Sequence, residues 1–427
     1  MTKAGQPYLC IHFQNMKAAL LLILSLFLVT AGYAQYRTQA QQIILTNEDS
    51  LNAGGIGHKR TVVSGYGSAL YQRDFTWERS RATLERAVLF IGHQFNSRIA
   101  FFSEMEIENA LVAGMEEKGE IAMEQAFLKF NLNSRQYLVA GLFIPRIGIL
   151  NENHLPVNFN GVERPIVETL VIPATWRELG VGFYGTLPNQ PLNYSIALVN
   201  GLDSKGFVHG TGIVGGRAEG SNAMANNIAV TAALQYSFDN FKVQVSGYTG
   251  GTTGMNKRGA DSLGLNSGAF GTPVYLGEAD VQYNKDGWSA RVLGTYISLP
   301  EANKVNRAYA TNIANSMYGA YAELGYDLFH AFNVQKKGQL VAFGRYEMLD
   351  LNASIPSPEA IYDGTLKQSH LIAGLTYLPI PNVCVKADVR LQQTGNANPA
   401  LIINPSPNAL PYQTNITFLN IGVGYSF

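Results

Sequence analysis

Three glutamates, Glu104, Glu106 and Glu108, occupy alternate positions in one short stretch of the sequence. Successive side chains of an extended chain point to opposite faces, so these three carboxylates share a face. Such a stripe could bind a divalent cation or guide cations past it. The commoner arrangement is a solvated wall whose acids pair with bases on neighbouring segments, because exposed ion pairs are frequent and specific sites are few.

The local motifs that identify many enzymes are missing from this sequence. It contains no Gly-x-Ser-x-Gly, no His-Glu-x-x-His and no P-loop, and its seven histidines show no metal-ligand spacing. We therefore assign no catalytic residue, no metal and no cofactor. An enzyme whose site is formed only by the fold, such as a membrane-embedded hydrolase, stays open as an alternative.

Apolar and polar residues alternate along many short segments. In 383–393, Lys386, Asp388 and Arg390 lie between apolar residues at every second position. Sixteen such segments predict strands. Their predicted bounds are 62–71, 82–95, 97–109, 121–132, 135–148, 174–187, 192–202, 225–238, 241–250, 273–283, 288–299, 314–328, 338–348, 366–378, 383–393 and 416–427.

The connections between these segments are sorted by length. Those after even-numbered strands are mostly tight, 329–337 being the exception, and those after odd-numbered strands are long. The long connections are 72–81, 110–120, 149–173, 203–224, 251–272, 300–313, 349–365 and 394–415. Short turns at one rim and long loops at the other are typical of outer-membrane barrels. The last strand ends on the aromatic Phe427, which suits a strand that pairs with the first one rather than an exposed sheet edge.

Composition agrees with a barrel in lipid. Charged residues make up 15% of the chain, below the ~25% typical of soluble domains, while glycine and aromatic residues are frequent. The formal net charge is zero, which gives no reason to expect a nucleic-acid partner. We predict an all-β fold, a transmembrane antiparallel up-and-down β-barrel of about 16 strands with a pore-constricting loop. A soluble fold with the charged faces outward is the alternative, because alternation alone does not distinguish inside from outside.

The N-terminus has the features of a secretion signal. Lys17 precedes an apolar run over 18–30, and small residues up to Ala34 fit a signal-peptidase site. We predict a signal peptide over 1–34 with a true start at Met16, a periplasmic segment over 35–61, and a barrel over 62–427. The mature protein would reside in the outer membrane of a Gram-negative cell, in contact with lipid.

If the polar faces surround water, their charged residues line a pore. The predicted pore-lining residues are Glu104, Glu106, Glu108, Lys129, Lys242, Glu278, Asp280, Arg291, Glu323, Arg345, Glu347, Lys386, Asp388 and Arg390. With Glu178, acids outnumber bases, which predicts mixed selectivity or a weak cation preference.

Three stretches resemble the phosphate-selective porin O and P family, particularly its Bacteroidetes-type outer-membrane porins. They are Gly141–Gly148, Val162–Pro165 and Thr175–Gly182. The resemblance implies a sixteen-stranded channel that forms a homotrimer, with a long loop folded into the pore. Connection 149–173 matches that loop in position and length.

A passive diffusion channel for small hydrophilic solutes or ions is therefore the expected function, and a structural or adhesive barrel with a blocked lumen is a further alternative. The residues predicted to form the constriction are Arg146, Glu152, His154, Glu163, Arg164, Glu168, Arg177 and Glu178. Glu163 and Arg164 could instead tether the loop to the barrel wall.

Overall fold

The computed structural model describes residues 37–38, 40–41, 61–108, 120–223, 225–332, 338–401 and 411–427. By its internal contacts the chain divides into two units, Met1–Ala34 and Gln35–Phe427, and all described residues belong to the second. The predicted signal peptide lies outside the described residues, as does most of the predicted segment 35–61. That part of the domain division stays a prediction.

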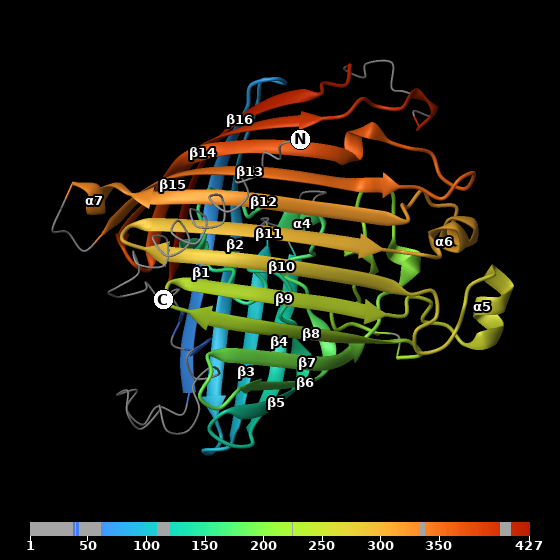
Figure 1. The fold of residues 1–427 in the computed structure, drawn as a ribbon, viewed down its shortest axis with the longest axis horizontal. Helices are drawn as coiled ribbons and strands as arrows, with labels where there is room; N and C mark the ends of the chain where they lie inside the picture. The colour runs from blue at the N-terminus through green and yellow to red at the C-terminus, as the bar shows by residue number, and fades with distance from the viewer. Residues whose placement is uncertain are drawn as a thin grey trace, which may run out of the picture. The chain divides into compact units, whose positions relative to one another are not determined.

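Sixteen antiparallel strands form one closed barrel, in which each strand pairs with its neighbours in sequence and β1 pairs with β16 (Figure 1). The predicted all-β barrel is confirmed. The strands are β1 Thr61–Asp74, β2 Arg79–Gln94, β3 Ile99–Glu108, β4 Glu120–Asn131, β5 Gln136–Phe143, β6 Glu178–Thr186, β7 Leu192–Asn200, β8 Ile228–Phe238, β9 Phe241–Gly250, β10 Val274–Lys285, β11 Trp288–Ser298, β12 Ser316–Asp327, β13 Gln339–Ser354, β14 Lys367–Ile380, β15 Val383–Thr394 and β16 Asn415–Ser426.

Short helices occur in the connections. They are η1 Pro156–Asn158, α4 Val167–Leu170, η2 Ser204–Gly206, η3 Val214–Gly216, α5 Lys257–Leu263, α6 Ala302–Tyr309, α7 Leu328–Ala331, η4 Gly364–Leu366 and η5 Pro399–Leu401. Among the described residues, no helix has the length and apolar character needed to cross a membrane.

The last residue closes the barrel. Phe427 exchanges two backbone hydrogen bonds with Gly65, at 3.0 and 2.9 Å, and β16 continues this pairing along β1. Gly65 is required there because a Cβ would lie 2.3 Å from the carbonyl oxygen of Val88. Closure removes the unpaired sheet edge that a terminal apolar strand would otherwise expose.

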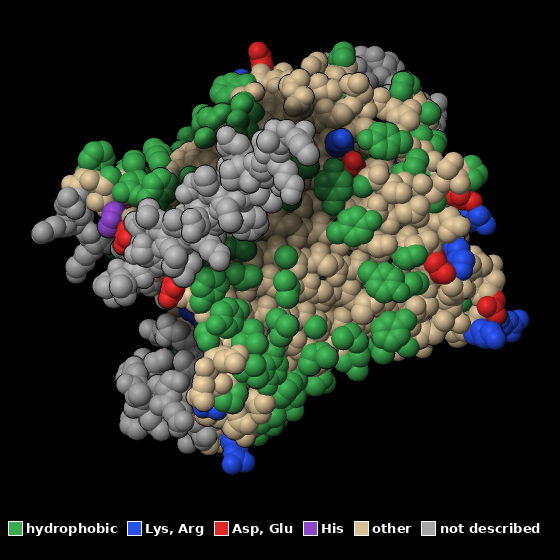
Figure 2. Space-filling model, viewed as in Figure 1, with side chains coloured by type: hydrophobic (Ala, Val, Ile, Leu, Met, Phe, Trp, Pro, Cys, Tyr) green, Lys and Arg blue, Asp and Glu red, His purple; other side chains and the backbone are tan. Residues whose placement is uncertain are grey.

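The outer face of the barrel is apolar and its inner face is polar. Along β15, Val385 and Val389 are both 43% exposed, whereas Lys386 and Asp388 are both 4% exposed. Figure 2 shows hydrophobic side chains spread over the visible barrel wall. This pattern matches a wall wetted by lipid rather than by water.

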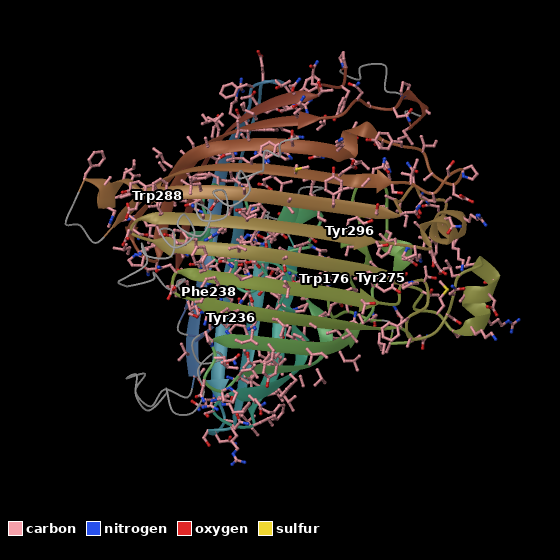
Figure 3. All side chains as sticks on the ribbon, in the orientation of Figure 1. Trp176, Tyr236, Phe238, Tyr275, Trp288 and Tyr296 are labelled. Atoms are coloured by element: carbon pink, nitrogen blue, oxygen red, sulfur yellow. The ribbon has the colours of Figure 1, made fainter. Side chains whose placement is uncertain are left out.

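Exposed aromatic residues lie near both ends of the strands. Figure 3 shows Tyr236, Phe238 and Trp288 near the short-turn ends, and Tyr275 and Tyr296 near the ends that lead into long loops. Aromatic side chains in two such belts are typical of the two membrane–water interfaces.

Several predicted boundaries differ from the structure: β6 begins at Glu178 rather than at 174, and β13 ends at Ser354 rather than at 348. Two further differences have clear local reasons. Connection 72–81 is a tight turn, because β1 extends to Asp74, whose Oδ1 accepts hydrogen bonds from the backbone N–H groups of Thr76 and Trp77. Strand β5 ends at Phe143 rather than at 148, since Pro145 has no N–H for the ladder. The predicted loop 149–173 is therefore longer and runs over 144–177.

Candidate functional site: the loop inside the barrel

Loop 144–177 lies inside the barrel and reaches strands far from its ends. The backbone N–H of Val162 donates to Asp388 on β15 at 2.7 Å, and that of Val167 donates to Glu347 on β13 at 3.0 Å. The loop begins after β5 and ends before β6, which are distant from β13 and β15 in the strand order. It therefore crosses the interior, and the wall carboxylates satisfy backbone groups that would otherwise be buried without partners.

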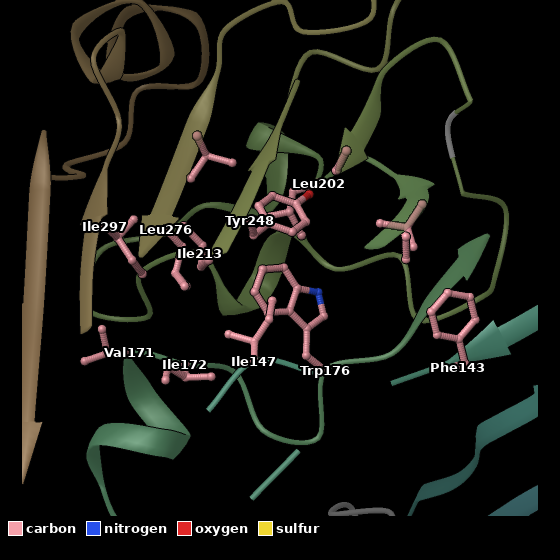
Figure 4. Packing of buried hydrophobic residues seen from close by; sticks show 14 of the residues in the cluster. Phe143, Ile147, Val171, Ile172, Trp176, Leu202, Ile213, Tyr248, Leu276 and Ile297 are labelled. Carbon is pink, nitrogen blue, oxygen red and sulfur yellow. The ribbon is translucent and has the colours of Figure 1, made fainter. Parts of the chain in front are cut away.

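A hydrophobic cluster fixes the base of the loop. Trp176 is fully buried and packs on Tyr248 of β9, with ring centroids 4.6 Å apart. Its indole N–H donates to Glu178 on β6 at 2.8 Å. Figure 4 shows Ile147 and Ile172 of the loop beside Trp176 and facing residues of the barrel wall, including Leu276. This packing fills part of the interior with side chains.

Glu168 on α4 holds the loop in its own fold and joins it to the wall. Its Oε2 accepts hydrogen bonds from the backbone N–H groups of Ile149 and Leu150, both at 2.8 Å, and its Oε1 accepts one from the hydroxyl of Tyr321 on β12 at 2.7 Å. Burial raises the pKa of Glu168 to about 7, although these hydrogen bonds oppose the shift.

Glu152 forms a second anchor of the loop. Its carboxylate lies 3.2 Å from Arg146 and 3.0 Å from Lys242 of β9, and it accepts a hydrogen bond from Gln235 of β8 at 3.0 Å. Burial alone would raise the pKa of Glu152, but the two cations lower it well below its usual range. This carboxyl therefore stays ionised at neutral pH.

Arg345 of β13 connects two wall carboxylates to the loop backbone. It lies 3.1 Å from Glu323 and 2.9 Å from Glu347, and it donates to the carbonyl oxygen of Asn160 at 3.1 Å. All three charged side chains are buried. Removing Arg345 would leave two buried carboxylates without their cation.

Glu163 tethers the loop to the wall through ion pairs. Glu163 lies 2.9 Å from Arg390 of β15 and 3.6 Å from Arg81 of β2. The Nη2 atom of Arg164 is buried and has no hydrogen-bond partner among the described residues. The structure thus shows the tethering role for Glu163, and for Arg164 that role stays a prediction.

A cluster that the sequence did not indicate joins His154 of the loop to β3 and β4. His154 Nε2 lies 3.0 Å from Glu104 Oε1 on β3 and 3.8 Å from Glu124 Oε2 on β4. Burial lowers the pKa of His154 to about 4, so its imidazole is neutral at pH 7. Glu124 could not be predicted from the sequence. Positions 124 and 129 lie on opposite faces of a regular strand, so a strand with Lys129 inside would have Glu124 outside.

A β-bulge changes the face that Glu124 occupies. The register between β3 and β4 moves from Glu104↔Gln125 to Met105↔Met123, so Glu124 has no partner in the ladder. Extra residues of this kind re-aim side chains. Glu124 is consequently buried inside, and Met123 is 44% exposed on the outer face.

The remaining predicted site residues also contact the loop or the inner wall. Arg291 donates to the carbonyl oxygen of Asn158 at 2.5 Å, and Lys386 donates to that of Phe159 at 2.7 Å. Arg177 lies 2.8 Å from Glu219, and Lys129 lies 4.4 Å from the ring centre of Tyr137. On the wall, Glu106 and Glu108 pair with Arg86, while Glu278 accepts from Ser246 and Asp280 from Gln282.

Burial of these residues differs from what a water-filled pore requires. Apart from Glu108, Lys242 and Arg291, the predicted pore-lining side chains are buried, and many of them contact loop 144–177. These side chains form hydrogen bonds with the loop backbone and ion pairs with one another. Few of their charges are therefore exposed to water.

A small cavity lies between the loop and strands β1, β2, β15 and β16. It holds about 20 Å³, room for roughly one water molecule. Its charged lining consists of Arg86, Arg164, Lys386 and Glu85, and His154 borders it. Bases thus outnumber acids in the lining of this cavity.

The fold defines a sixteen-stranded, porin-like β-barrel with an internal loop. Solved structures with this fold include the anion-selective porin from Comamonas acidovorans (TM-score 0.50, 10% identity, 86% of this chain and 99% of that one). The Salmonella typhi OmpF complex with daunomycin is similar to the same degree (TM-score 0.50, 13% identity, 86% and 97%). At these identities the likeness concerns the fold alone.

In sequence, the chain belongs to the family of an uncharacterized protein of Aquifex aeolicus (strain VF5). The two are 30% identical over 343 residues, which span 77% of this chain and 75% of that protein. No family model matches the chain. Membership of the phosphate-selective porin O and P family therefore stays a resemblance in the three stretches named above.

Proposed function

We propose that the protein is an outer-membrane porin, a passive diffusion channel for small hydrophilic solutes or ions whose flux is set by loop 144–177. The observation that carries this proposal is a closed barrel with an apolar outer face and a loop inside it. Loop 144–177 crosses the interior, and charged side chains of the barrel wall hold it there. The expected secretion signal and the porin-like fold support residence in the outer membrane. No catalytic role is proposed.

On this proposal, the route past the loop runs along β1, β2, β15 and β16. The cavity lies there, and Arg81, with 60% of its side chain exposed, and Glu163, with 23%, border the same side. Solutes would pass when the loop moves away from this wall. The route would widen most if contacts such as that between Asp388 and Val162 were released.

We further propose a weak anion preference along this route. The excess of acids in the sequence favoured cations, but most of those acids are buried in hydrogen bonds and ion pairs. The cavity is lined by Arg164 and Lys386, and by Arg86 and Glu85, which pair with each other. The charges that line a constriction determine ion preference. We also propose that the protein forms a homotrimer, as its resemblance to the phosphate-selective porins implies. Chemical crosslinking in membranes checks the trimer.

Single-channel recording in planar bilayers tests the function. The refolded protein should give discrete conductance steps, and Asp388→Ala should give larger or more frequent openings, because the loop loses the hydrogen bond at Val162. Asp261→Ala, on the exposed face of α5, is the matched control and should behave as the wild type. A salt gradient across the same bilayer gives a reversal potential, and a clear cation preference would contradict the proposed selectivity.

A barrel with a blocked lumen is the second candidate, and burial of the wall charges beneath the loop favours it. In that case the wild type would not conduct under any condition, while Asp388→Ala would. Conductance steps in the wild type would exclude it. If neither protein conducts although both are folded, the porin proposal fails.

A further inference from the structure

We propose that Glu104, Glu124 and His154 form a binding site for a divalent first-row transition-metal ion such as Zn²⁺. The site joins three separate segments: β3, the bulge of β4, and the internal loop. Each residue is almost fully buried, with exposures of 0%, 0% and 3%. The binding itself does not depend on channel activity.

The donor atoms are already grouped as a metal ion requires. One atom from each residue lies within 4.8 Å of the others, and His154 Nε2 is 3.0 Å from Glu104 Oε1 and 3.8 Å from Glu124 Oε2. Zinc binds imidazole nitrogen and carboxylate oxygen at ~2.0–2.2 Å, so tetrahedral ligands lie about 3.3 Å apart. Small side-chain adjustments would complete three-fold coordination and leave one position open.

Unsatisfied buried atoms provide an independent reason to expect a ligand. Glu124 Oε2 points into the cluster and has no hydrogen-bond partner among the described residues. A buried carboxylate oxygen without a partner is costly, because it has lost its hydration without compensation. A cation between Glu104 and Glu124 would compensate both carboxylates.

The surrounding residues hold the carboxylates in place. Gln125, the residue that follows Glu124 in the bulge, donates to Glu104 Oε2 at 2.6 Å. The Thr175 hydroxyl donates to Glu124 Oε1, and Arg177 lies 3.8 Å from the same oxygen. These bonds use the outer oxygens and leave Glu104 Oε1 and Glu124 Oε2 towards His154. Partners of this kind orient metal ligands.

The chemistry of the donors selects the class of metal. An imidazole nitrogen with two carboxylate oxygens suits zinc, manganese or ferrous iron better than calcium, which takes oxygen ligands only. The two carboxylates would balance the charge of a divalent ion.

A bound ion would cross-link the loop to the β3–β4 wall. His154 is the only loop residue of the three, so coordination would add a bond between the loop and the barrel wall. On the proposed function, metal binding would reduce movement of loop 144–177 and lower conductance. This regulatory role rests on the porin proposal, whereas the site does not.

Calorimetric titration of the refolded full chain, without a polyhistidine tag, tests the site. After treatment with EDTA and dialysis, ZnCl₂ is titrated into the protein in detergent. One zinc ion per chain is expected for the wild type, and the stoichiometric site should be lost in His154→Ala and Glu124→Gln. His209→Ala is the matched control, because His209 lies 2.8 Å from Asp363 in a contact between other loops. It should bind zinc as the wild type does.

Two results would overturn the proposal: no zinc bound by the folded wild type, or unchanged binding by a folded His154→Ala variant. If the variants do not fold, X-ray absorption of the zinc-loaded wild type decides. One imidazole nitrogen with oxygen ligands supports the site, and several imidazoles or a sulfur ligand contradict it. Conductance is recorded separately with zinc and with EDTA. Zinc binding to a non-conducting barrel would leave the site intact and reject the porin, while conductance unaffected by bound zinc would reject only the regulatory role.

Discussion

The hydroxyl of Tyr321 on β12 donates a 2.7 Å hydrogen bond to Glu168 of loop 144–177, in the interior of the barrel. Glu168 also accepts two backbone hydrogen bonds within the loop, so one carboxyl group stabilises both the fold of the loop and its attachment to the wall. Because burial raises the pKa of this carboxyl to about 7, the attachment depends on pH.

We expect the loop attachment to weaken as pH rises through about 7. A glutamate in the unfolded chain titrates near 4.3, so the native state binds this proton more tightly. The contribution to stability is then fully present below about pH 4.3 and is lost as pH rises through the native pKa. Thermal unfolding in detergent between pH 5 and 8.5 should show this loss in the wild type.

The variant Glu168→Gln isolates that effect. It carries no titrating group at this position and should show a smaller fall in melting temperature over the same range. Tyr321→Phe removes a hydrogen bond that favours the ionised carboxylate, so its transition should move to higher pH. An unchanged pH profile in Glu168→Gln would assign the dependence to other groups.

Arg345→Met should destabilise the barrel by about 3–5 kcal/mol, because Glu323 and Glu347 would remain buried without their cation. Urea unfolding in lipid vesicles measures the free energy. The triple variant Arg345→Met, Glu323→Gln and Glu347→Gln removes the charges together and should recover much of the loss. If Arg345→Met alone is as stable as the wild type, Arg345 is not needed to compensate the two carboxylates, which would contradict this prediction.

Gly65→Ala should impair barrel closure. Its Cβ would lie 2.3 Å from the carbonyl oxygen of Val88 on β2, the strand that pairs with β1. Overpacking of this kind costs about 1–3 kcal/mol. The folded fraction is measured by heat-modifiable migration on gels. Gly277→Ala is the matched control, since a Cβ there meets no atom within 4 Å, and equal folded fractions would contradict the prediction.

Arg164→Gln should shift the reversal potential towards cations, because Arg164 is the cavity base whose Nη2 lacks a hydrogen-bond partner among the described residues. Arg307→Gln serves as control, since Arg307 pairs with Glu359 away from the cavity. A reversal potential that does not change in Arg164→Gln would place the ion path elsewhere.

The sequence by itself determined the barrel. Two-residue alternation and turn residues are local properties, so they located all sixteen strands, including the terminal strand that ends at Phe427, and separated an apolar face from a polar one. The errors were also local: Asp74 and its turn shortened one connection, and Pro145 ended β5 early.

Only the tertiary structure decided what fills the interior. Alternation cannot detect a bulge, so it gave no sign that Glu124 faces the interior. It also cannot show that a loop residue such as His154 will meet Glu104, fifty positions earlier in the chain. The sequence predicted that Asp388 and Glu347 line a water-filled pore. In the structure, both carboxylates accept hydrogen bonds from the backbone of loop 144–177. Their environment depends on where that loop packs, and hydrophobic burial of Trp176 and hydrogen bonds from distant strands determine its position.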